Sequence, residues 1–108
     1  MSDYLFIQSQ DPFTEARTQS HYQLAQTLQQ AGHKVSMLLV QNGVIPARHG
    51  AQSPLFDELQ QSGIAITADI FSLAQREITL QELKSHVSPG HIDTVIDAML
   101  AGHKVIWN

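Results

Sequence analysis

Short apolar runs alternate with helix-like segments along this chain, and that alternation most constrains its fold. Buried strands are predicted at residues 4–9, 35–40 and 63–67, and a terminal strand at residues 104–107. Uninterrupted apolar runs of this length are typical of parallel strands that are covered on both faces. The segments between them are long enough to cross over as helices, so we expect a parallel sheet with helices on both sides.

Cap and stop residues predict where the first helices begin and end. Asp11 followed by Pro12 predicts a helix start, because aspartate accepts the free N–H groups and proline is favoured at the first helical position. Gly32 supplies the stop. Ser53 and Pro54 repeat the same pair of signals and predict a second, shorter helix.

The second half of the chain continues the pattern. A third helix is predicted at residues 69–76, and Thr79 with Glu82 matches a capping box. Residues 88–90 have the Ser-Pro-Gly composition of a turn, and a last amphipathic helix spans residues 92–99. The expected order is β-α-β-α-β-α-α-β in one domain, residues 1–108. The fold class is α/β: three α/β/α layers with a mainly parallel four- or five-stranded sheet, flavodoxin-like in the simplest case.

Composition excludes several classes of function. The net charge is −4 and the six Lys and Arg residues are scattered, so no basic stripe is present to bind nucleic acid. The absence of cysteine removes disulfides, thiolate metal sites and thiol chemistry together. No apolar run reaches membrane length and the first residues do not resemble a signal peptide, so we expect a cytoplasmic protein with no membrane partner.

A ligand site is expected where parallel strands end, near the switch in strand order. With a flavodoxin-like order of 2-1-3-4, that switch falls between the first and third strands. The candidate pocket consists of the polar and small residues that follow the first three strands: Ser9, Gln10, Asp11, Gln41, Asn42, Thr67, Ala68 and Asp69.

Two carboxylates in this set have alternative interpretations. Asp11 and Asp69 each stand directly before a helical pattern, which favours a capping role. Their shared position at the strand ends also allows an acid/base pair. The chain has neither a G-x-S-x-G elbow nor a glycine fingerprint after its first strand, so we predict no catalytic serine and no cofactor.

The six histidines do not form a metal-binding pattern. His33 and His103 occur in the same pentapeptide, AGHKV, before two predicted strands, which indicates an identical helix–glycine–strand junction. His86 and His91 flank the predicted turn. His49 follows Arg48 in a loop, where the pair suits either a solvated surface or a bound anion. We therefore predict no metal site.

Four segments together resemble the DsrE/DsrF-like family of sulfur-relay proteins, which includes the TusBCD subunits and YchN-like proteins. They are the opening strand YLFIQS, the junction AGHKV after the first long helix, the strand–turn–helix ADIFSLAQREI and the closing MLAGHKVIWN. The resemblance covers essentially all 108 residues and implies the DsrE-like form of the α/β fold. It departs from the family pattern at Glu77, where glycine is expected between Arg76 and Ile78.

Active members of the family carry a cysteine at the start of the third helix, where the helix N-terminus stabilises a thiolate or persulfide. Counting back from Arg76, that cysteine aligns with Asp69, or with Ala68 if the register slips by one. Neither residue holds a sulfane sulfur, so sulfur transfer does not carry over to this chain.

Unlike sulfur transfer, the assembly of family members into oligomers is an expectation that applies to this chain. The resemblance implies a homo-oligomer, trimer or hexamer, or a hetero-oligomer with related subunits, with sulfur-carrier proteins as further partners. Trp107 is a candidate interface residue, or it closes the core at a strand end. Our leading hypothesis is a non-catalytic DsrE-like subunit with a structural or binding role. The alternative is a small-ligand or enzymatic domain that uses Gln10, Asp11, Asn42 and Asp69.

Overall fold

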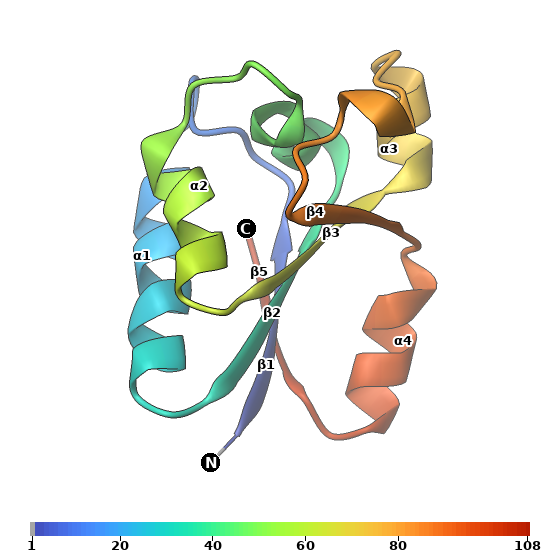
Figure 1. Ribbon diagram of the computed structural model, residues 1–108. Helices are drawn as coiled ribbons and strands as arrows, with labels where there is room; N and C mark the ends of the chain where they lie inside the picture. Colours follow the sequence, from blue (N-terminus) through green and yellow to red (C-terminus); the bar gives the residue numbers. More distant parts are fainter. Residues whose placement is uncertain (1) are drawn as a thin grey trace.

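A five-stranded parallel sheet runs through the centre of the protein, whose computed structural model describes residues 2–108 (Figure 1). The strands lie in the order β4-β3-β2-β1-β5, and every neighbouring pair is parallel. Their bounds are β1 Asp3–Gln8, β2 Lys34–Leu39, β3 Ala65–Asp69, β4 Val87–Gly90 and β5 Lys104–Trp107.

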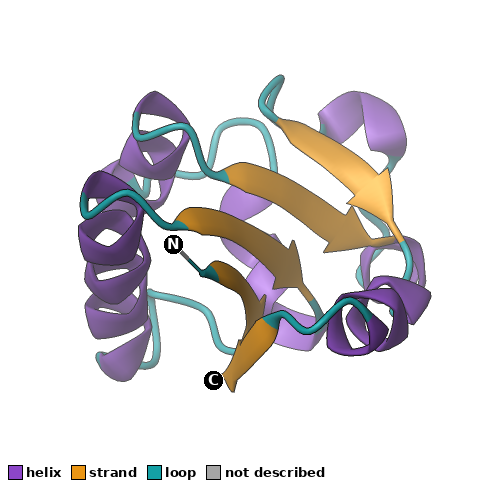
Figure 2. Ribbon diagram, turned by 90° about the horizontal axis from the view of Figure 1, so that it is seen from below, coloured by secondary structure: helices purple, strands orange, loops and turns teal. Residues whose placement is uncertain are grey.

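Helices cover both faces of this sheet. Helices α1 and α2 lie on one face and α4 on the other, so the sheet is the middle of three layers (Figure 1), and the view from below also shows the strands between helices (Figure 2). The predicted α/β/α class is therefore confirmed. The helices are α1 Arg17–Gln30, α2 Pro54–Gln61, α3 Ile70–Gln75 and α4 Asp93–Leu100, with two 3₁₀ helices, η1 Gln41–Ala47 and η2 Leu80–Glu82.

The predicted strand order is wrong, although the class is right. β1 lies between β2 and β5, not between the second and third strands, because the chain adds β2, β3 and β4 successively on one side and then returns to place β5 on the other. The predicted turn at residues 88–90 is also wrong, since these residues belong to β4. Pro89 is tolerated there because β4 is an edge strand.

Element boundaries differ from the sequence pattern in two places. β3 extends to Asp69, so Thr67 and Ala68 lie inside the strand and not in the turn after it. Helix α1 begins at Arg17, later than the signal at Asp11 and Pro12 predicts, because Asp11 instead closes a separate turn. The capping box at Thr79 and Glu82 is present and opens η2.

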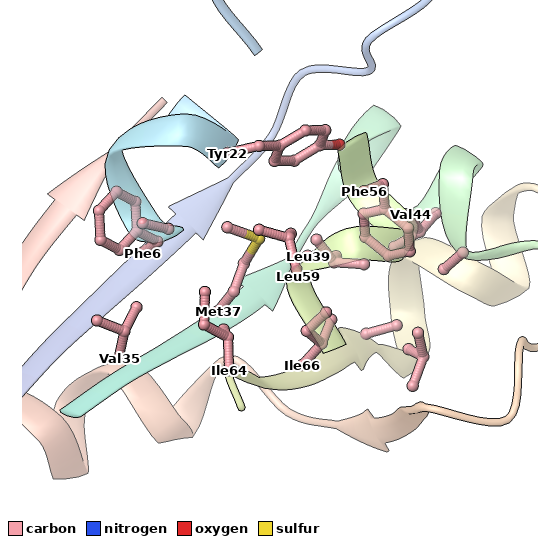
Figure 3. Close-up of a cluster of buried hydrophobic side chains, with 14 of the residues drawn as sticks. Phe6, Tyr22, Val35, Met37, Leu39, Val44, Phe56, Leu59, Ile64 and Ile66 are labelled. Atoms are coloured by element: carbon pink, nitrogen blue, oxygen red, sulfur yellow. The ribbon is translucent and has the colours of Figure 1, made fainter. Parts of the chain in front are cut away.

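The face under α1 and α2 carries the larger hydrophobic core (Figure 3). Phe6, Met37 and Ile66 point to this face from neighbouring strands, and Tyr22 and Phe56 meet them from the helices. The Tyr22 and Phe56 rings pack edge to face with centroids 5.8 Å apart. Sixteen buried residues form this cluster, which we call the major core.

The face under α4 carries a smaller cluster, which we call the minor core. It has five buried members, Leu5, Ile7, Leu38, Val40 and Ala98, with Val95 and Val105 partly buried around them. These strand residues alternate with those of the major core, as the pleat of a sheet requires. One short helix thus covers this face.

The repeated AGHKV pentapeptide forms the same junction twice. Gly32 and Gly102 adopt positive φ angles of 98° and 83°, a conformation that glycine reaches without strain. β2 and β5, which follow these glycines, flank β1 on its two sides. His33 Nδ1 accepts a hydrogen bond from the Ser2 amide, and His103 lies 3.5 Å from the Asp3 carboxylate, so both imidazoles hold the start of β1.

None of the helices within residues 2–108 is both long and apolar enough to cross a lipid bilayer.

Candidate functional site

The predicted site residues share one end of the sheet but do not surround one point. Ser9, Gln10 and Asp11 follow β1, Gln41 and Asn42 follow β2, and Asp69 ends β3. β2 separates the first group from the last. Two strand spacings amount to about 10 Å. The predicted meeting of the first and third strands is therefore replaced by a row of three strand ends.

Asp69 is the N-cap of α3, as predicted. Its Oδ2 accepts hydrogen bonds from the Ser72 amide at 3.0 Å and the Ser72 hydroxyl at 2.8 Å. Asp69 is only 7% exposed. Its other oxygen, Oδ1, is buried and has no hydrogen-bond partner among residues 2–108.

Ser72 connects this cap to the end of β2. Its Oγ accepts a hydrogen bond of 2.7 Å from the Gln41 amide while donating to Asp69. Gln41 has a φ of 51°, which costs a residue with a Cβ about 1–2 kcal/mol. The Ser72 hydroxyl therefore holds Gln41 in a strained conformation at the end of the strand.

Arg76 makes a second connection across the same two elements. Its Nε and Nη2 donate to Asn42 Oδ1 at 3.2 and 2.9 Å, and its Nη1 donates to the Ser72 carbonyl at 3.2 Å. The side chain of Asn42 therefore has a structural role, because it joins the segment after β2 to the end of α3. Sequence reasoning missed the roles of Ser72 and Arg76, because both bonds join segments about thirty residues apart.

Asp11 is also a capping residue, but of a turn and not of α1. Its Oδ1 accepts from the amides of Phe13 and Thr14 at 2.8 and 3.0 Å, and its Oδ2 accepts from the Thr14 hydroxyl at 2.9 Å. Asp11 and Asp69 each serve their own turn. The geometry thus favours the capping interpretation over the acid/base pair.

Gln8 is a buried polar residue that the sequence pattern treated as part of an apolar strand. Its Nε2 donates to the Gln10 carbonyl at 3.0 Å and to Thr18 Oγ1 at 3.4 Å, while its Oε1 has no partner within residues 2–108. The Tyr22 hydroxyl is likewise buried without a partner in the described chain. Burial, with the charge of Asp11, raises the pKa of Tyr22, so this phenol stays neutral.

The remaining site residues are structural. Ser9 bonds the end of β5: its amide and hydroxyl both donate to the Asn108 carbonyl, at 2.6 and 2.7 Å. Ala68 is fully buried in the major core. Thr67 is half-buried and packs beside Gly90, where a Cβ would come within 3.0 Å of the Thr67 Cβ.

Two surface depressions lie beside this row of strand ends and are lined by other residues. One, of about 290 Å³, lies between the turn at Pro12 and Phe13 and the start of α2 at Ser53. The other, of about 340 Å³, is lined by the loop that holds Arg48 and His49. Arg48 lies 3.7 Å from Glu82, so its charge is partly matched. Within residues 2–108, no three His, Asp or Glu side chains gather closely enough to hold a metal ion.

Comparisons with known proteins agree with this architecture. The model of the DsrE/DsrF-like family matches residues 2–107. No curated protein sequence matches the chain significantly.

Solved structures share the fold at low sequence identity. The YchN protein from E. coli superposes with a TM-score of 0.88 at 14% identity, over 100% of both chains. The protein MTH1491 from Methanobacterium thermoautotrophicum gives 0.86 at 16%, again over 100% of both chains. The protein BT1422 from Bacteroides thetaiotaomicron gives 0.77 at 15%, over 98% of this chain and 95% of the other. These similarities establish the fold.

Proposed function

Because this chain belongs to the DsrE/DsrF-like family, we propose that it is a non-catalytic subunit of an oligomeric assembly linked to sulfur relay. One observation carries the proposal: the chain contains no cysteine. The family resemblance aligns the sulfur acceptor of active relatives with Asp69, the N-cap of α3, or with Ala68 if the register slips by one. The proposed role of the chain is to bind or organise partner subunits.

Asp69 is chemically unsuited to sulfur transfer. Accepting a sulfane sulfur requires a thiolate that forms a sulfur–sulfur bond, and a carboxylate forms none. Its negative charge repels an incoming persulfide anion. Both contacts that Asp69 makes with Ser72 also stabilise the start of α3.

An assembly is supported by the apolar surface of the chain. Only 15% of residues are charged, and nine large hydrophobic side chains are exposed within the described residues. Five of them gather at α4 and β5: Ile92, Ile96, Met99, Leu100 and Trp107. Contiguous exposed apolar patches mark interaction surfaces, and the placement of these five side chains on two elements adjacent in the chain supports such a surface.

The test combines two measurements on the purified wild-type chain. Light scattering after size exclusion should give the mass of an oligomer. Incubation with inorganic polysulfide followed by intact mass spectrometry should add no sulfur atom, because no thiol is present to accept it. A monomer at micromolar concentrations, or stable covalent uptake of sulfur, would contradict the proposal.

One observation favours the alternative, a small-ligand site at the strand ends, and it concerns Asp69 alone among the predicted residues Gln10, Asp11, Asn42 and Asp69. The buried Oδ1 of Asp69 has no partner among residues 2–108, and a ligand donor or a water satisfies such an atom. Native mass spectrometry separates the two functions. A co-purifying small molecule that Asp69→Asn loses would support the ligand site, whereas bare protein in both samples would count against it.

A further inference from the structure

Asn42 and Gly43 form a chemically labile pair just after β2. Asparagine is a thermolabile residue, because the backbone nitrogen of the next residue can attack its side-chain carbonyl carbon. A Cβ on that next residue hinders the attack, and glycine has none. The sequence contains one Asn-Gly pair, and it lies in η1 with the asparagine exposed to solvent.

The fold requires the glycine of this pair. Gly43 is buried, and a Cβ on it would collide with the carbonyl oxygen of Gln8 at the end of β1. No larger residue fits there unless the end of β1 moves. The chain therefore keeps the residue that makes Asn42 reactive, and any protection of Asn42 has to come from contacts around it.

Two hydrogen bonds restrain the pair in the folded chain. The amide of Gly43, whose nitrogen is the attacking atom, donates to the Val40 carbonyl at 2.9 Å. The side-chain oxygen of Asn42 accepts from Nε and Nη2 of Arg76 at 3.2 and 2.9 Å. Ring closure requires the Asn42 side chain to rotate toward Gly43 and its backbone to leave the helical conformation. Both hydrogen bonds oppose these changes.

The backbone on each side of the Arg76–Asn42 contact is strained. Within residues 2–108, Gln41 and Glu77 are the two residues other than glycine with a positive φ, at 51° and 55°. Gln41 directly precedes Asn42, and Glu77 directly follows Arg76. Strained backbone of this kind persists only where surrounding contacts hold it. Loss of the Arg76 contact should therefore loosen the segment around Asn42.

We propose that Asn42 is a site of spontaneous deamidation and that Arg76 slows this reaction in the folded chain. The Gly43 nitrogen forms a bond to Cγ of Asn42, the bond from Cγ to Nδ2 breaks, and the proton of the Gly43 amide leaves with Nδ2 as ammonia. Water then opens the five-membered ring at either carbonyl, which gives aspartate or isoaspartate. No oxidant, reductant or cofactor takes part. The inference goes beyond the proposed function and does not depend on it.

The two products should affect the end of β2 differently. Aspartate at position 42 gives Arg76 a carboxylate partner, so the contact becomes an ion pair with charge-assisted hydrogen bonds. Isoaspartate lengthens the main chain by one carbon atom within η1, which moves Gly43 from its place against Gln8. The first product preserves the geometry of the strand ends, and the second disturbs it.

The test compares the rates of deamidation of folded variants. Wild-type, Arg76→Ala and Arg76→Lys chains are incubated in native buffer, and peptide mass spectrometry measures the fraction converted at position 42. Both substitutions remove the paired donors to the Asn42 oxygen, although lysine keeps the charge. Each should raise the native rate up to about tenfold, because hydrogen bonds from a charged donor no longer hold the side chain.

Matched controls isolate the contact. Arg17→Ala removes an exposed arginine on α1 and should leave the rate unchanged. Asn42→Gln keeps an amide beside Arg76 but needs a larger ring, so it should give no product. In concentrated urea, the wild-type and Arg76→Ala chains should react equally fast, and faster than the native wild-type chain. Circular dichroism identifies a variant that fails to fold, and the other Arg76 variant then replaces it.

Four results would overturn the inference. Equal native rates in the wild-type chain and the folded Arg76 variants would show that the contact does not restrain Asn42. A slower rate in the variants would show that Arg76 activates the side-chain carbonyl. A native wild-type chain that reacts as fast as the unfolded chain would show that the fold gives no protection. An unfolded chain without conversion at position 42 would remove the site itself. None of these results changes the oligomeric mass or the sulfur uptake that test the proposed function.

Discussion

The two faces of the sheet differ in how completely this chain covers them. The face under α1 and α2 carries sixteen buried core residues, and the face under α4 carries five. Large apolar side chains stay exposed around the smaller cluster, with Leu100 reaching 83% exposure. The chain itself covers the first face, whereas the second keeps exposed apolar side chains of the kind found at interfaces.

This difference separates the proposed assembly surface from the strand ends, where active relatives of the family carry their cysteine. The strand ends of β2 and β3 are joined by Asp69, Ser72 and Arg76, which make polar contacts within the chain. The apolar surface lies at β5 and α4. A chain without a thiol can therefore keep the proposed assembly surface, which is consistent with the proposed role as a non-catalytic subunit.

The largest expected effect comes from truncating the major core. Phe56 is fully buried, and Phe56→Ala should lower the free energy of unfolding by about 3–5 kcal/mol. The matched change on the other face, Leu100→Ala, should alter monomer stability by no more than about 0.5 kcal/mol. Urea unfolding at low protein concentration measures both. Similar losses for the two variants would remove the contrast between the faces.

Protein concentration should raise the apparent stability if a second copy covers the face of the sheet under α4. Unfolding of such a dimer includes dissociation, and each tenfold increase in protein concentration adds about 1.4 kcal/mol of apparent stability per dimer. Thermal unfolding across a hundredfold dilution series tests this. Ile96→Lys should abolish the dependence. A wild-type midpoint that does not move with concentration would show that the face is stable uncovered.

The N-termini of α2 and α3 can be compared, because they differ in how they are capped. Asp69 caps α3 with its side chain, whereas Ser53 precedes α2 and makes no side-chain cap. Asp69→Ala should cost about 1 kcal/mol, and Ser53→Ala only a few tenths. Urea unfolding of the two variants checks the difference. Equal effects would show that the side-chain cap of Asp69 adds no more stability than Ser53, which makes no such cap.

Low pH should lower the free energy of unfolding through residues on the face of the sheet under α1 and α2, and not through residues on the face under α4. His21 packs on Phe6 and His86 on Phe56, and burial lowers the pKa of both imidazoles below 6.5. Since the folded state holds them neutral, the unfolded state binds more protons as pH falls below about 6.5, and stability decreases until the folded pKa is passed. His86→Gln should flatten this loss in pH-dependent unfolding. An unchanged slope would exclude His86 as its source.

Sequence pattern predicted the layers and most elements because buried parallel strands and glycine-stopped helices have strong local signals. It predicted Asp69 as a cap for the same reason. It could not place β5 beside β1, since the side on which the last strand adds depends on packing between distant segments. It misassigned Pro89, whose preference for turns is overridden at a sheet edge.

Within the site, the missed residues share one property. Ser72 and Arg76 act on Gln41 and Asn42, which lie more than thirty positions away in the chain. No local spacing encodes such a bond. Gln8 was missed for another reason, because a single amide at the end of an apolar run carries no signal that it is buried.

The measurement that tests the account most directly is amide hydrogen exchange in α4 of the wild-type chain. α4 covers the minor core, which has only five buried members, so its amides should exchange readily at high dilution. At concentrations where the chain assembles, we predict that this exchange slows markedly, while the amides of α1, which packs on the major core, change little. Exchange in α4 that is equally rapid at every concentration would contradict the claim that assembly covers this face.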